Sequence, residues 1–175
     1  MKKLSQLAKS YNVLFADMDG TLIETKSGKT FPEDWTDWQF KDDVLESIIN
    51  LAPDYLLIVT NQGGIGKFVT VADFEKKLSN IVDGLRLRTG VRTVEAAYCA
   101  SEDKNEPMRK PNIGMFTQFT KALNLNDKKD MLMIGDASGK PGNFSDSDKK
   151  FAINAGIDYL DVNDFVKIFY TKKKS

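Results

Sequence analysis

The chain alternates short, almost wholly apolar segments with longer amphipathic ones, and this pattern leaves few folds open. Four apolar runs that end in polar residues or glycine are expected to be buried strands: 13–17, 55–60, 94–99 and 131–134. Segments with apolar residues at helical spacing are expected to be helices: 42–51, 70–85, 113–123 and a stretch that begins after Ser145. This alternation predicts an α/β doubly wound domain with a central parallel sheet covered by helices on both faces.

Three positions carry signals for the start of a helix. Thr70 is placed to cap the helix that follows it, and Pro111 suits the first turn of the helix over 113–123. Asp148 is placed for a contact like that of a capping box in the helix after Ser145. We expect one domain over 1–175, with its core at about 11–170 and a small flap after the first strand.

The sequence contains no histidine and one cysteine, Cys99. Catalytic triads with histidine, His-ligated metals and internal disulfides are therefore excluded, and no zinc is expected. The chemistry has to use carboxylates, hydroxyls and lysines, with or without a hard cation. With 25 basic and 25 acidic residues the net charge is zero, which argues against a strongly basic nucleic-acid-binding protein but leaves room for a local basic track.

Asp17-Met18-Asp19-Gly20-Thr21 closes the first predicted strand. Two carboxylates two residues apart can converge on one point, and Gly20 lets the chain turn sharply. One carboxylate can attack phosphorus and form an acyl-phosphate, while the other protonates the leaving oxygen and later activates water. The alternative is an ordinary turn, because Asp and Gly are common turn formers.

Other polar residues stand where further strands end or helices begin. Thr60 follows the second strong strand, and Asp136 follows the run at 131–134. Catalytic loops of parallel sheets gather at the carboxyl ends of the strands, so we expect these residues to lie near Asp17. Lys110 precedes a helix and can neutralise a phosphate, and an acid at position 136 can ligate Mg²⁺. Taken singly, each has a structural alternative, as a cap, a loop residue or a surface lysine.

The order Asp-x-Asp-Gly-Thr, then Thr, then Lys, then Gly-Asp resembles the four-motif signature of the haloacid dehalogenase (HAD) superfamily, from Val13 to about Gly156. The resemblance implies a Rossmann-like HAD phosphatase without a full cap domain, with Mg²⁺ as cofactor and an aspartyl-phosphate intermediate. The roles expected in such an enzyme are Asp17 and Asp19 as catalytic residues; Asp17, Asp19 (by its backbone carbonyl) and Asp136 as metal ligands; Thr60, Asn61 and Lys110 as phosphate-binding residues; and Asp148 as a candidate further ligand or outer-sphere group.

Several segments also resemble the phosphatase domain of polynucleotide kinase 3′-phosphatase: 25–32, 37–38, 60–66, 109–111, 114–115, 135–141, 144–145, Asp148 and 151–156. The resemblance implies hydrolysis of 3′-phosphate termini on DNA or RNA, as in DNA repair. Residues expected to contact the substrate are Thr25, Ser27, Lys67 and Trp38. The chain departs from the usual HAD spacing at Lys140, where a second acid is common, and Asp148 is expected to take that role.

The insertions at about 24–40 and 100–110 are too short for a full cap, so an open site that admits a polymer end is expected. Trp35 and Trp38, beside three lysines, are expected either to stack on bases or to pack against the core. The main rival function is a small-molecule phosphatase that acts on a nucleotide or sugar phosphate. A phospho-accepting signalling domain fits less well.

Nucleic-acid 3′ ends are thus the expected partner. No apolar run approaches the roughly 20 residues that span a bilayer, so no membrane partner is expected. A monomer is expected. The expected location is intracellular, either cytoplasmic or, in a eukaryote, nuclear.

Overall fold

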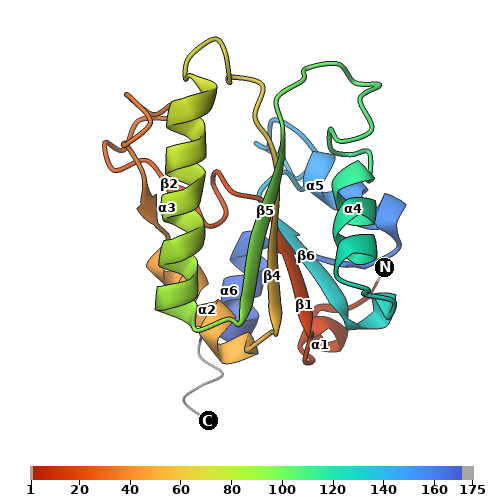
Figure 1. The fold of residues 1–175 in the computed structure, drawn as a ribbon. Coiled ribbons are helices and arrows are strands. Elements are labelled where there is room, and N and C mark those ends of the chain that lie inside the picture. The colour runs from red at the N-terminus through yellow and green to blue at the C-terminus, as the bar shows by residue number, and fades with distance from the viewer. Residues whose placement is uncertain (1, 171–175) are drawn as a thin grey trace.

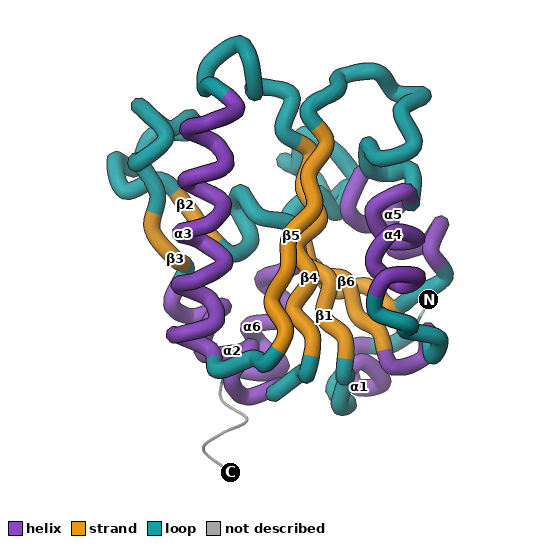
Figure 2. Tube along the Cα trace, in the orientation of Figure 1, coloured by secondary structure: helices purple, strands orange, loops and turns teal. Residues whose placement is uncertain are grey.

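A five-stranded parallel sheet runs through the centre of the molecule (Figures 1 and 2). Its strands are β1 (Val13–Ala16), β4 (Tyr55–Asn61), β5 (Thr93–Cys99), β6 (Met131–Gly135) and β7 (Asp158–Asp161). They pair in the order β5-β4-β1-β6-β7, which places β1 between β4 and β6. This computed structural model describes residues 2–170, and the last five residues of the expected 1–175 domain lie outside the described part.

Helices cover both faces of the sheet, as the alternating pattern predicted (Figure 1). They are α1 (Leu4–Leu7), α2 (Asp42–Leu51), α3 (Val71–Thr89), α4 (Gly114–Ala122), α5 (Ser147–Ala155) and α6 (Val162–Phe169), with a 3₁₀ turn at Lys128–Asp130. Alternate residues of β1 enter two separate cores. Leu14 packs with the side chains of α2, α3 and α6, whereas Phe15 packs with α4 and α5 and lies 5.2 Å from the Phe116 ring.

The helix starts differ in how well the sequence predicted them. Thr70 caps α3 as expected, because its hydroxyl accepts a hydrogen bond from the Asp73 amide at 3.1 Å. The prediction for Pro111 was wrong: α4 begins at Gly114, and Pro111 lies in the preceding loop. The prediction for Asp148 was also wrong, because its buried side chain turns away from the helix start and bonds to Lys110 and to the Ala137 amide.

The expected flap follows β1 as a small antiparallel hairpin of β2 (Ile23–Glu24) and β3 (Gln39–Phe40). The Asp37 carboxylate holds the long turn between these strands. It accepts hydrogen bonds from the amide and hydroxyl of Ser27 at 2.9 and 2.7 Å, and from the Glu33 amide at 2.9 Å. These bonds, the Ser27 hydroxyl first, lower the pKa of Asp37 to about 2. Among residues 2–170, no helix combines the length and apolar character needed to cross a membrane.

Candidate active site

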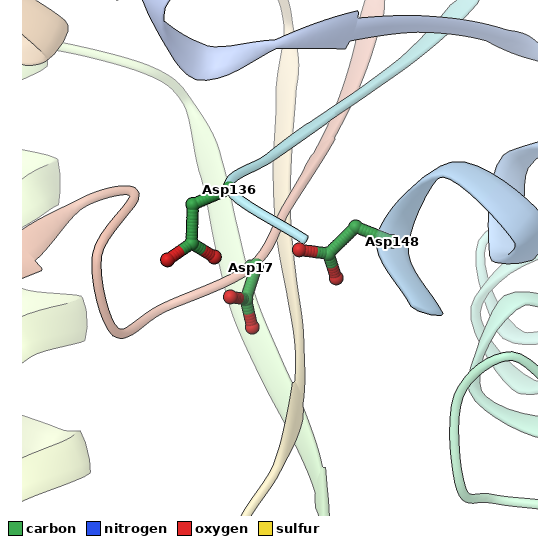
Figure 3. A group of neighbouring side chains, drawn as sticks. All are labelled: Asp17, Asp136 and Asp148. Atoms are coloured by element: carbon green, nitrogen blue, oxygen red, sulfur yellow. The ribbon is translucent and has the colours of Figure 1, made fainter. Parts of the chain in front are cut away.

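Three carboxylates meet at the carboxyl ends of the central strands (Figure 3). Asp17 follows β1, Asp136 follows β6, and Asp148 projects from the first turn of α5. Each offers an oxygen that lies within 4.8 Å of the oxygens of the other two. The ligands of Mg²⁺ lie at about 2.1 Å, so opposite ligands are about 4.2 Å apart, and this cluster has suitable dimensions for such an ion.

Lys110 lies between two of these acids. Its side chain is 2% exposed, and its ammonium donates to Asp17 Oδ1 at 2.9 Å and to Asp148 Oδ1 at 2.6 Å. Burial disfavours the charged lysine, but the two carboxylates outweigh it and raise the pKa of Lys110. Because one ammonium faces three carboxylates, two negative charges stay uncompensated when all three acids are ionised.

The pKa values of the acids reflect that imbalance. Burial raises the pKa of Asp17 to about 6, and the charges of Asp136 and Asp19 act in the same direction against that of Lys110. Burial and the charge of Asp17 raise the pKa of Asp148 to about 6 as well. The pKa of Asp136 is raised by burial and by Asp148. A divalent cation at this point would favour the ionised acids, so the charge and the donor chemistry both suit one.

Two glycines make room for the cluster. Gly20 has a φ of +75°, and a Cβ on it would lie 2.2 Å from Asp136 Oδ2. A Cβ on Gly135 would lie 2.3 Å from Asp148 Oδ2. Real Cβ atoms do not approach other atoms so closely, so the acids can reach these positions only because neither residue has a side chain.

Asn61 and Gln62, at the end of β4, fix neighbouring groups. The Asn61 amide is paired with the backbone of Lys110: its Nδ2 donates to the carbonyl at 3.0 Å and its Oδ1 accepts from the amide at 2.9 Å. The Asn61 side chain therefore fixes the backbone of Lys110. Gln62 Nε2 donates to Asp19 Oδ2 at 2.8 Å and to Thr60 Oγ1 at 2.9 Å. Gln62 was not among the predicted site residues, although its place just beyond a strand end was a usable signal.

The residues expected to contact substrate have partners within the protein. Thr25 donates to the Lys29 carbonyl at 2.6 Å, and Ser27 belongs to the Asp37 contacts of the flap. Lys67 forms an exposed ion pair with Glu102 at 2.6 Å. Trp38 is half-buried against the core, with its ring 5.1 Å from Phe40 in an edge-on arrangement, which supports the packing alternative for this residue.

A second set of polar contacts, with Tyr159 and Asp161 of β7, holds the loop that carries Asp136. The Ser138 hydroxyl donates to Asp161 Oδ2 at 2.6 Å, and the Tyr159 hydroxyl donates to the Gly135 carbonyl at 3.1 Å. The Ser138 and Tyr159 hydroxyls also lie 2.5 Å from each other, and Ser138 is buried. These contacts tie the loop after β6 to β7 and were not foreseen, because β7 itself was not.

Comparisons with known proteins agree with this geometry. A family model described as polynucleotide kinase 3 phosphatase matches residues 12–166. A bifunctional polynucleotide phosphatase/kinase of Schizosaccharomyces pombe is 35% identical over 163 residues, which cover 90% of this chain but 38% of that protein. A 20.8 kDa protein of Autographa californica nuclear polyhedrosis virus, from the FGF-VUBI intergenic region, is 32% identical and is covered over 88% of its length, with 92% of this chain. The chain thus spans well under half of the yeast relative.

Other similarities extend to a histidine biosynthesis protein and to phosphatases of known structure. The histidine biosynthesis bifunctional protein HisB of Buchnera aphidicola is 34% identical over 131 residues, covering 73% of this chain and 36% of HisB. Among solved structures, the D,D-heptose 1.7-bisphosphate phosphatase of B. bronchiseptica, complexed with magnesium and phosphate, has a TM-score of 0.64 at 19% identity over 85% of this chain and 78% of that one. A HAD-like phosphatase structure from Mesorhizobium loti has a TM-score of 0.63 at 24% identity, covering 93% and 88%. The structural neighbours confirm the HAD fold, and the family model shows that the chain belongs to the polynucleotide kinase 3 phosphatase family.

Proposed function

We propose that this chain is a Mg²⁺-dependent phosphatase that removes the phosphate from the 3′ end of a nucleic acid, DNA in the first place, and leaves a 3′-hydroxyl. The observation that carries the proposal is the cluster of Asp17, Asp136, Asp148 and Lys110 at the strand ends of a chain that belongs to this family. Repair of nucleic-acid ends by an intracellular monomer forms part of the proposal.

Asp17, Asp136 and the backbone carbonyl of Asp19 would hold the cation. Asp148 would act as an outer-sphere group, since one of its oxygens accepts a hydrogen bond from Lys110 and the other accepts one from the Ala137 amide at 3.0 Å. When bound, Mg²⁺ would supply positive charge against the phosphoryl oxygens.

The reaction would proceed in two displacements at phosphorus. In the first, an Asp17 oxygen forms a bond to phosphorus, the bond from phosphorus to the 3′ oxygen breaks, and that oxygen takes a proton from Asp19. In the second, Asp19 accepts a proton from water as the water oxygen bonds to phosphorus and the bond to Asp17 breaks. Inorganic phosphate and the 3′-hydroxyl are the products, and both acids return to their starting state.

Thr60 and Lys110 would hold the group in transfer. The Lys110 ammonium has three hydrogens, of which Asp17 and Asp148 accept two, so the third is free for a phosphoryl oxygen. Thr60 is 1% exposed at the end of β4, beside the strand that carries Asp17. Asn61 would contribute to phosphate binding indirectly, because its contacts fix the position of Lys110.

The decisive experiment compares phosphate release from three substrates: a 3′-phosphorylated oligonucleotide, its 5′-phosphorylated twin, and a 3′-mononucleotide. We expect kcat/KM to be highest for the 3′-phosphorylated oligonucleotide. Equal rates for the 3′- and 5′-phosphorylated strands would contradict the proposed substrate.

A second candidate is a small-molecule phosphatase with the same chemistry. The similarity to HisB, named for histidine biosynthesis, favours it. The two functions differ in their dependence on chain length, because an enzyme for small phosphates gains nothing from added nucleotides. A 3′-mononucleotide hydrolysed as fast as the oligonucleotide would favour this second function.

A further inference from the structure

Gln62 connects two groups of the proposed reaction. It lies one residue beyond β4, with its side chain half-buried. An amide nitrogen carries two hydrogens, and Gln62 Nε2 uses both: one for Asp19 Oδ2 at 2.8 Å and one for Thr60 Oγ1 at 2.9 Å. The direction of the first bond follows from the amide, because an amide nitrogen donates hydrogen bonds and does not accept them, so Asp19 Oδ2 is the acceptor. Gln62 therefore acts as a donor to both groups.

The contact matters for Asp19 because this residue lies on an exposed turn. Within residues 2–170, Gln62 is the only side chain that hydrogen-bonds to the Asp19 carboxylate. A carboxylate with a single partner takes its orientation from that partner. Because Oδ2 accepts from Gln62, Oδ1 is the oxygen left to carry the proton that is transferred.

The second contact determines how the Thr60 hydroxyl can act. A hydroxyl has one hydrogen to donate and two lone pairs that accept. Gln62 occupies an accepting position of Thr60 Oγ1, and the described residues offer no acceptor for its hydrogen. Threonine is branched at Cβ, so its χ1 rotamer is restricted and Oγ1 stays in place. Because Gln62 uses only an accepting position of Oγ1, the hydroxyl hydrogen stays available to an oxygen of the phosphoryl group.

We propose that Gln62 is a positioning residue for the phosphatase reaction. It orients the Asp19 carboxyl so that Oδ1 exchanges the proton, and it leaves the Thr60 hydroxyl free to donate to the phosphoryl group. The inference rests on the proposed function, since it concerns the same Asp19 and Thr60. It assigns Gln62 no contact with the substrate.

The test uses two variants and a matched control. Gln62→Met keeps an unbranched side chain of similar length but removes both donors, and Gln62→Glu keeps the shape while replacing the donor group by an acceptor. Gln118→Met makes the same change at an exposed glutamine of α4, which takes no part in the site. Thermal unfolding of all variants shows whether they are folded, and Gln62→Glu carries the test if Gln62→Met melts early.

Two substrates separate the acid step from the base step. A 3′-phosphorylated oligonucleotide has an alkoxide leaving group that needs a proton, whereas the leaving group of 4-nitrophenyl phosphate departs without one. On the oligonucleotide we expect kcat of the Gln62 variants to fall roughly 10- to 100-fold, the value of a lost hydrogen bond to a charged group, with little change in KM. On 4-nitrophenyl phosphate we expect one equivalent of nitrophenolate per site to be released at close to the wild-type rate. Slow turnover should follow, because hydrolysis of the aspartyl-phosphate needs Asp19 as its base.

That burst distinguishes positioning of Asp19 from a packing role. Loss of packing would slow the first nitrophenolate release as much as the turnover of the oligonucleotide, and this result would overturn the inference. Wild-type turnover in both Gln62 variants would overturn it as well. A wild-type enzyme that hydrolyses neither ester would instead refute the proposed function, and the inference with it. We expect Gln118→Met to behave as the wild type on both substrates.

Discussion

The substitution Lys110→Met tests how the fold accommodates its acids. It removes a buried ammonium that lies 2.9 Å from Asp17 and 2.6 Å from Asp148, and leaves both carboxylates without their cation. Breaking a buried ion pair by removal of one partner costs about 3–5 kcal/mol. For a chain of this size, each kcal/mol lowers Tm by about 2–4 °C, so we expect a loss of roughly 6–20 °C in the absence of metal at pH 8.

The loss of stability in Lys110→Met should depend on pH. Asp17 and Asp148 have pKa values of about 6 in the fold, above their ordinary 3.8. The folded state therefore binds more protons than the unfolded state between these values, and stability falls as the pH rises through that window. Without Lys110 both pKa values rise further, so the window extends to higher pH. The variant should thus lose most stability at pH 8 and less at pH 5, where its acids are protonated.

The measurement is urea unfolding of the wild type and Lys110→Met in EDTA at pH 5 and pH 8. Lys121→Met, at an exposed lysine of α4, is the matched control and should change stability by less than about 0.5 kcal/mol. A loss below about 1 kcal/mol at pH 8, or a loss of the same size at both pH values, would refute the charge balance derived for the site.

The remaining predictions concern the metal, the acids and the flap. EDTA should abolish activity and Mg²⁺ should restore it, whereas a zinc-selective chelator should have no effect in a phosphate-release assay, because the sequence lacks histidine. Asp17→Asn should abolish turnover because an amide is too poor a nucleophile, and Asp19→Asn should lower kcat roughly 10²- to 10⁴-fold. Trp38→Ala should lower stability by about 2 kcal/mol and reduce activity equally on oligonucleotide and aryl phosphate; a loss confined to the oligonucleotide would restore the stacking role. Asp37→Asn should destabilise the protein above pH 4, and its difference from the wild type in urea unfolding should shrink as the pH falls toward 2, since the lowered pKa of Asp37 gives stability that protonation removes.

The sequence predicted most of the sheet because most strands are buried on both faces. Every residue of β1 and β6 is buried, and their runs are correspondingly apolar. The edge strand β7 escaped detection because it pairs on one side and includes two aspartates in four residues. Helix α6 follows it directly, with Asp161 as its cap, and was missed with it. The single-domain organisation stays a prediction.

The candidate site could be predicted only in part, for a similar reason. Asp17 and Asp136 were identifiable because each follows an apolar strand, and Thr60 because it lies at the end of one; strand order then brings the three together. Their catalytic roles remain predictions. The contacts of Asp148 depend on where α5 sits against the loop before α4, and no local pattern encodes that placement.

The missed contacts share one physical feature: a side chain from one segment fixes a group of another. Asn61 holds the backbone of Lys110 across 49 residues, Gln62 holds the Asp19 carboxylate across 43, and Asp148 holds the Lys110 ammonium across 38. Each contact exists only after the two segments that carry its partners have come together in the fold. Short sequence patterns predict the groups that would act on phosphate, whereas the groups that hold them in place can be identified only from the fold.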